Sequence, residues 1–84
     1  MKLRYDPTAD GLYIYFGRKR RASQTKEVHR ADSLCLIDYD KDGNPIGVEI
    51  LGTRRGIDVT GLPREAEVAA LLEAHGFEVL TRSR

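Results

Sequence analysis

The densest group of metal-ligating residue types lies in the middle of the chain. Its carboxylates and glycine match the calcium-loop pattern D-x-D-x-D-G-x5-E, the matching residues being Asp38, Asp40, Asp42, Gly43 and Glu49. A calcium loop of this kind lies between two amphipathic helices. Here the flanking segments 34–39 and 46–51 are short, apolar and rich in β-branched residues, which is typical of strands. We therefore interpret the run as an acidic hairpin turn and predict that no metal is bound.

Four consecutive bases follow a strand-like segment that carries two tyrosines. The group consists of Arg18, Lys19, Arg20 and Arg21, with Tyr13 and Tyr15 shortly before them. Such bases contact phosphates and tyrosine rings stack on nucleobases, so the group suits nucleic acid or another anionic partner. A solvated loop tip accounts for the same run of charge. Both interpretations stay open at the level of the sequence.

Nothing in the sequence predicts a catalytic group or a cofactor. Cys35 is the only cysteine, and no motif places His29 or His75 beside it as a base, so we interpret it as a buried thiol. A single cysteine also excludes an internal disulfide. The prediction is that the protein is not an enzyme and uses no cofactor.

Length and composition indicate one soluble domain over residues 1–84. The chain is 40% hydrophobic and 32% charged, and no stretch approaches the roughly 20 apolar residues of a membrane span. It opens without an apolar signal region, so we expect it in the cytoplasm with no membrane partner. Residues 1–30 hold eight bases against three acids, whereas residues 31–84 hold six bases against ten acids. This asymmetry favours attraction across a dimer or toward a charged partner.

A strong turn signal predicts a central β-hairpin. Asp42-Gly43 supplies residues that tolerate positive φ in a two-residue loop. That register pairs apolar residues on one face, namely Tyr39 with Ile46, Ile37 with Val48 and Cys35 with Ile50. A three-residue loop, 41–43, with a bulge at the glycine would shift the pairing by one residue and mix the two faces. We prefer the two-residue loop because it keeps the acidic strand residues off the most buried side.

A first hairpin precedes the central one. Segments 2–5 and 12–16 alternate polar and apolar residues around D-P-T-A-D-G, whose proline and aspartates favour a turn. The side chains expected on the core face are Leu3, Tyr5, Leu12, Ile14 and Phe16. A short third strand is expected over residues 26–30, with Val28 directed inward.

One helix is predicted near the end of the chain, from Pro63 to His75. The residues expected in its apolar stripe are Val68, Leu71, Leu72 and His75. Gly76 suits the left-handed position just after a helix C-terminus. Residues 77–80 are expected to add an edge strand, and residues 81–84 to fray.

These elements predict an α+β fold, with an antiparallel sheet of four or five strands built from two hairpins and one C-terminal helix packed on one face. One helix covers only one face of a sheet, so an apolar patch remains on the other. We expect a homodimer to form there, with another protein partner as the alternative. The candidate interface residues are Leu34, Leu36, Glu49 and Leu51.

Two motifs, Y-D-P-T-A-D-G-L-Y-I and D-Y-D-K-D-G-N-P-I-G-V-E-I-L, together resemble the domain of unknown function 2283 family of small bacterial proteins. The matching residues are Tyr5, Asp6, Asp10, Leu12, Tyr13, Ile14, Asp38, Asp40, Gly43, Gly47, Glu49, Ile50 and Leu51. The resemblance covers about residues 2–52, as a β-rich core, and leaves residues 53–84 as a loop, helix and terminal strand.

This resemblance implies a compact β-rich fold, no established activity and no catalytic residues to carry over. Members of such families are suspected of being antitoxin-like partners of small toxins. The function expected from the whole sequence is a non-enzymatic protein-interaction module, and an antitoxin-like role is one form of it. Nucleic-acid binding through residues 18–21 is the alternative.

Overall fold

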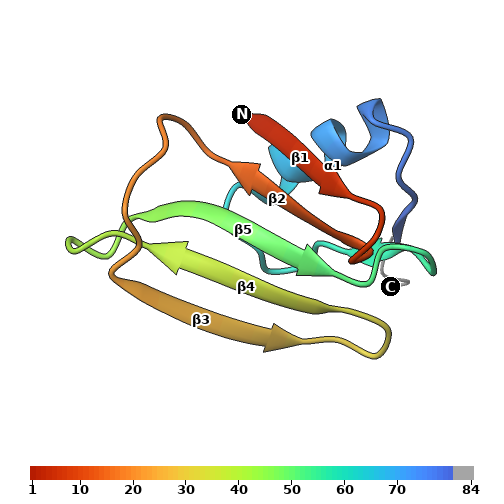
Figure 1. The fold of residues 1–84 in the computed structure, drawn as a ribbon, viewed down its shortest axis with the longest axis horizontal. Helices are drawn as coiled ribbons and strands as arrows, with labels where there is room; N and C mark the ends of the chain where they lie inside the picture. Colours follow the sequence, from red (N-terminus) through yellow and green to blue (C-terminus); the bar gives the residue numbers. More distant parts are fainter. Residues whose placement is uncertain (81–84) are drawn as a thin grey trace.

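The computed structural model describes residues 1–80 and is built on one antiparallel sheet. Its five strands are β1 (Lys2–Asp6), β2 (Gly11–Tyr15), β3 (Gln24–His29), β4 (Leu34–Tyr39) and β5 (Pro45–Leu51), in the spatial order β1-β2-β5-β4-β3 (Figure 1). The remaining elements are β6 (Ile57–Asp58), α1 (Glu65–Ala74) and β7 (Val79–Leu80). The predicted α+β fold with two hairpins and one helix is confirmed. The expected fraying of residues 81–84 lies outside the described residues.

The core face of the sheet follows from strict alternation along the strands. In the central hairpin Ile37 lies opposite Val48 and Cys35 opposite Ile50, as the preferred register predicts. Antiparallel pairing of β2 with β5 then joins the two hairpins. The buried apolar residues that these three strands share are Leu12, Ile14, Cys35, Ile37, Val48 and Ile50. Cys35 is fully buried, as predicted.

The turn of the central hairpin differs from the two-residue loop that the sequence predicts. The amide of Asp40 donates to the carbonyl of Asn44 at 2.9 Å, which leaves three residues, 41–43, in the loop. The Asp40 carboxylate favours this longer turn, since it accepts the amides of Asp42 and Asn44 at 2.9 Å each. Gly43 takes the positive φ that the turn requires, 82°.

A three-residue loop was expected to shift the pairing and mix the two faces of the hairpin, but a bulge prevents this. Tyr39 lies opposite Pro45, yet Asp38 lies opposite Gly47, so Ile46 is an extra residue on β5. The longer loop shifts the register by one residue, and the bulge shifts it back. The apolar face therefore stays unmixed beyond the turn, although the expected pairing of Tyr39 with Ile46 is wrong.

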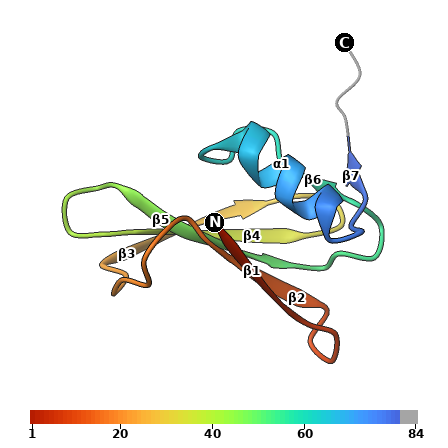
Figure 2. The ribbon, with the colours of Figure 1, turned by 90° about the horizontal axis from the view of Figure 1, so that it is seen from above.

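The helix, β6 and β7 all lie on the core face of the sheet (Figure 2). The helix starts at Glu65 instead of Pro63. Arg64 adopts a left-handed φ of 54°, so the right-handed helix cannot extend back through it to Pro63. Val68 and Leu72 are buried, but His75 is exposed and ends the helix instead of extending its apolar stripe. Gly76 takes the predicted left-handed conformation, with φ 85°.

Two further expectations are modified at the rim of the core. Val79–Leu80 does not extend the main sheet, because it pairs in parallel with Ile57–Asp58 in a separate two-stranded sheet. Tyr5 lies on the edge strand β1 and is 42% exposed, with its ring meeting Phe77 edge to face at 5.0 Å. The third strand forms as expected, and Val28 packs against the core.

Asp10 ties the first hairpin to the chain that leaves β5. Its carboxylate accepts the hydroxyl of Thr53 at 2.5 Å and the amide of Thr53 at 3.0 Å. Its carbonyl accepts the amide of Gly52 at 2.8 Å. The hydroxyl and the amide of Thr53 hold the pKa of the Asp10 carboxyl below its usual range. The sequence assigned this residue only to its own turn.

Acid should weaken both aspartate contacts. The amides that Asp40 accepts, that of Asn44 foremost, also lower its pKa, so Asp10 and Asp40 ionise at lower pH in the folded than in the unfolded chain. Their stabilisation is thus present above the unfolded pKa of about 3.9 and disappears as pH falls through the lowered folded values. We expect Asp10→Asn and Asp40→Asn to lose less stability on acidification than the parent chain does.

Urea unfolding at about pH 6 and about pH 2.5 measures this difference. Asp42→Asn, at the exposed tip of the same turn, is the matched control and should follow the parent chain. An acid-induced loss that is equal in all four proteins would contradict the assignment.

Candidate functional site

The helix leaves the second face of the sheet uncovered by any described residue (Figure 2). We call this surface the open face. Strand by strand from β1 to β3, alternation and register place on it Lys2, Arg4 and Asp6; Gly11, Tyr13 and Tyr15; Gly47, Glu49 and Leu51; Leu34, Leu36 and Asp38; and Thr25, Glu27 and His29. All four predicted interface residues are therefore on one surface, and each is half-buried.

Tyr13 reaches across the centre of the open face. Its hydroxyl, on β2, donates to the carboxylate of Asp38, on β4, at 2.7 Å. The ring crosses β5 above Gly47, where a Cβ atom would lie 2.5 Å from the tyrosine oxygen. Burial, followed by the hydrogen bond to Asp38, raises the pKa of Tyr13, so the hydroxyl stays a donor at neutral pH. The contact links the two hairpins across an intervening strand.

Asp38 also accepts the hydroxyl of Thr25, on β3, at 2.7 Å. One carboxylate thus joins three strands, and this use accounts for the first position of the calcium-like pattern. The third position, Asp40, is occupied with the amides of its own turn. Between residues 1 and 80, no three acidic, histidine or cysteine side chains gather in a way that would hold a metal ion. The pattern builds a hairpin and a strand contact.

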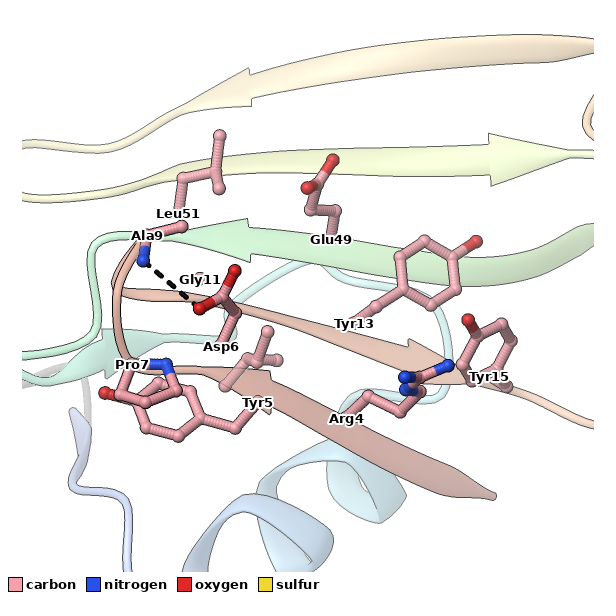
Figure 3. Close-up of a pocket in the computed structure, with 11 residues that line it drawn as sticks. Arg4, Tyr5, Asp6, Pro7, Ala9, Gly11, Tyr13, Tyr15, Glu49 and Leu51 are labelled. Carbon is pink, nitrogen blue, oxygen red and sulfur yellow. Dashed lines mark hydrogen bonds between the residues drawn. The ribbon is translucent and has the colours of Figure 1, made fainter.

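A groove of about 450 Å³ lies on the open face above β1 and β2 (Figure 3). The residues that line it include Arg4, Gly11, Tyr13 and Glu49. The rings of Tyr13 and Tyr15 lie together, with centroids 4.6 Å apart. Within the described part of the chain, neither Arg4 nor Glu49 has a hydrogen-bond or ion-pair partner. The groove therefore presents one free cation and one free anion.

Two residues of this site escaped the sequence analysis. Arg4 carried no signal, because a base on an edge strand is ordinary. Gly47 did carry one, since a glycine inside an apolar strand indicates the close approach of another group. What approaches it is Tyr13, which depends on β2 lying beside β5.

The basic run lies in the segment that carries the chain from β2 round the end of the sheet to β3 (Figure 1). Arg20 forms an ion pair with Asp40 at 3.7 Å. The other three bases have no such partner among residues 1–80. The hydroxyl of Tyr13 is bound to Asp38 on the open face and does not contact these bases. The grouping of the four bases with Tyr13 and Tyr15 as one binding site stays a prediction.

Arg64 approaches this segment from the helix. Its guanidinium lies 5.7 Å from the centre of the Phe16 ring, donates to the Phe16 carbonyl at 3.0 Å and binds both oxygens of Glu67. Arg64, Arg18 and Arg20 all line one cavity of about 320 Å³. No local pattern indicates this neighbour, because Arg64 lies 43 or more positions after the run.

The cysteine and the two histidines considered for nucleophilic chemistry lie in three different places in the fold. Cys35 points into the core, and burial raises the pKa of its thiol. His29 lies on the open face and contacts Glu27 at 3.0 Å. His75 ends the helix and contacts the Leu71 carbonyl at 3.0 Å.

The comparison with known protein families gives one match. The sequence pattern of the family described as "Protein of unknown function (DUF2283)" matches residues 2–54. The chain belongs to this family. The DUF2283 match takes in all five strands of the main sheet and the contact between Asp10 and Thr53, and it ends before α1. No curated protein and no solved structure matches the chain.

The structure also bears on membranes. None of the helices among residues 1–80 has both the length and the apolar character that crossing a membrane requires.

The centre of the open face should be sensitive to one added methyl group. At Gly47 a Cβ atom would lie 2.5 Å from the Tyr13 hydroxyl and 2.8 Å from the Ile14 carbonyl. We expect Gly47→Ala to lower the free energy of unfolding by about 1–3 kcal/mol, because backbone must move as well as a side chain. Urea unfolding measures the change.

Gly17→Ala is the matched control. Nothing lies within 4 Å of a Cβ atom at Gly17, and its φ is not positive. Its free energy of unfolding should stay within about 0.5 kcal/mol of the parent value. Equal losses at the two glycines would show that the close approach of Tyr13 is not what requires Gly47.

Proposed function

We propose that this DUF2283 protein is a non-enzymatic protein-interaction module that works through the open face of its sheet. The observation that carries the proposal is the one-sided cover of the sheet (Figure 2). The uncovered side presents Leu34, Leu36, Leu51, Tyr13 and Tyr15. An apolar patch of this kind, bordered by polar residues, is typical of an interaction surface.

The charges on the open face support the same proposal. Glu49 is half-buried between Tyr13 and Leu36 and has no partner within the described residues. Further burial of a carboxylate requires a base or a hydrogen-bond donor beside it. A partner polypeptide that supplies such a group would satisfy Glu49 while it covers the leucines.

A more specific role follows if the partner is a toxin. The antitoxin-like function that the family resemblance suggests is one form of the proposed module, with a toxin polypeptide on the open face. We place the module in the cytoplasm as part of the same proposal.

Site-specific photo-crosslinking in living cells tests the proposal. A benzophenone amino acid at Leu36, in the middle of the open face, should give an adduct with a polypeptide. The same group at Glu73, exposed on the far side of α1, is the matched control and should give none. If position 36 gives no adduct, or no more than position 73, the open face is not the working surface.

Nucleic-acid binding through the basic run is a second candidate function. Three bases that have no ion-pair partner within the described residues, Arg18, Lys19 and Arg21, support it. Phosphate contacts of this kind release counterions, so affinity should fall steeply with salt. This candidate needs no contribution from Tyr13.

Fluorescence anisotropy with single-stranded RNA measures this activity. We expect binding to weaken by at least about tenfold between about 50 and 200 mM salt, and to be lost when all four bases become serine. Serine at Arg54 and Arg55, exposed at the other end of the sheet, should leave binding within about twofold. Binding without salt dependence, or equally weakened by both sets of changes, would contradict the candidate.

A further inference from the structure

We infer that the occupant of the open face is a second copy of this chain, packed face to face about a two-fold axis that runs parallel to the strands between β2 and β5. This inference rests on the proposed function and names its partner. It is drawn from the arrangement of charge and shape across the open face.

The open face is divided by charge from one edge to the other. On this face strand β1 carries Lys2 and Arg4, which have no hydrogen-bond or ion-pair partner through their side chains among residues 1–80. It also carries Asp6, whose carboxylate accepts the amides of its own turn. The other acids of the open face lie on the strands beyond β2, with Glu49 on β5, Asp38 on β4 and Glu27 on β3. The base-rich edge of one copy is therefore complementary to the acid-bearing half of another.

Only one of the two simple symmetric arrangements uses this complementarity. A two-fold axis across the strands would keep each strand over its own counterpart, so Arg4 would meet Arg4 and Glu49 would meet Glu49. An axis parallel to the strands exchanges the two edges and places the bases of each copy over the acids of the other. Because a two-fold interface repeats each contact between two different residues, an attraction between a base and an acid forms twice in this arrangement.

The shape of the open face selects the position of that axis. The groove of about 450 Å³ lies above β1 and β2, while Leu34 and Leu36, both half-buried, lie on the same face of β4. An axis between β2 and β5 places β4 of one copy over β1 of the other. The two leucines of each copy then face the groove of the other copy, as in closely packed sheets about 10 Å apart.

The same arrangement pairs the two free charges of the groove. Arg4 of one copy lies next to Glu49 of the second copy, and the reverse contact forms on the other side of the axis. Neither residue has a hydrogen-bond or ion-pair partner in the part of its own chain that the structure describes. The aliphatic part of the Arg4 side chain also covers the leucines of β4 in the other copy, while its guanidinium reaches the Glu49 carboxylate.

The size of the face sets the expected affinity. Four strands spaced about 4.8 Å apart make a face roughly 20 Å wide. The area buried on such a face is at the small end of the areas that stable interfaces bury. We therefore expect a dissociation constant in the micromolar range, on the order of 10 μM.

Charge reversal tests the pairing. Sedimentation equilibrium of the full chain, from about 1 μM to about 1 mM, should show a dimer for the parent protein. Arg4→Glu and Glu49→Arg should each raise the dissociation constant by at least about tenfold. The double variant restores opposite charges across the axis and should return within about threefold of the parent value.

Glu73→Arg makes the same change of charge on the exposed side of α1 and is the matched control, with no expected effect. Arg4 is exposed on an edge strand, so its variant keeps the fold and gives a result even if Glu49→Arg unfolds. A parent protein that stays monomeric at about 1 mM overturns the inference. So does a folded double variant that associates no better than the singles.

The outcome is separable from that of the proposed function. A monomer that still forms an adduct through position 36 with a different polypeptide overturns only the second copy as occupant. Loss of every adduct at position 36 overturns the interaction surface itself.

Discussion

The hydrogen bond from Tyr13 to Asp38 determines much of what the open face presents. It spans β5 only because Gly47 leaves room for the ring, and it satisfies the half-buried Asp38 carboxylate within the chain. Because Thr25 donates to the same carboxylate, strands β2, β4 and β3 are connected through a single side chain. With Asp38 satisfied internally, Glu49 is the central carboxylate that remains for a contact outside the chain.

The second constraint is the small amount of cover on the sheet. A helix of 10 residues packs on one face of five strands, and β6 and β7 lie on the same side. A chain of 84 residues is near the lower size limit for an independent core, so burial of further apolar surface by association has a clear energetic benefit. The DUF2283 match covers the sheet, which places the open face within the part that defines the family.

Sequence reasoning identified what depends on local pattern and missed what depends on strand order. Short-range signals predicted the pairing of Ile37 with Val48, the left-handed conformation of Gly76 and the burial of Cys35. The sequence predicted a two-residue turn where the structure has three residues. The bulge at Ile46 restores the register further along the strands, so the apolar pattern there is the same for both turns. The contacts of Tyr13 and Asp10 join residues 25 and 43 positions apart, and no local pattern encodes them. Arg4 enters the site beside Glu49 only once β2 is known to lie beside β5.

The most direct measurement of the central claim is an isotope-filtered nuclear Overhauser experiment on an equal mixture of labelled and unlabelled chains at about 1 mM. The account predicts contacts between copies from the methyl groups of Leu36 to the side chain of Arg4, and none from Val68 in the core beneath α1. Contacts between copies that arise only from the helix side, or their complete absence, would contradict it.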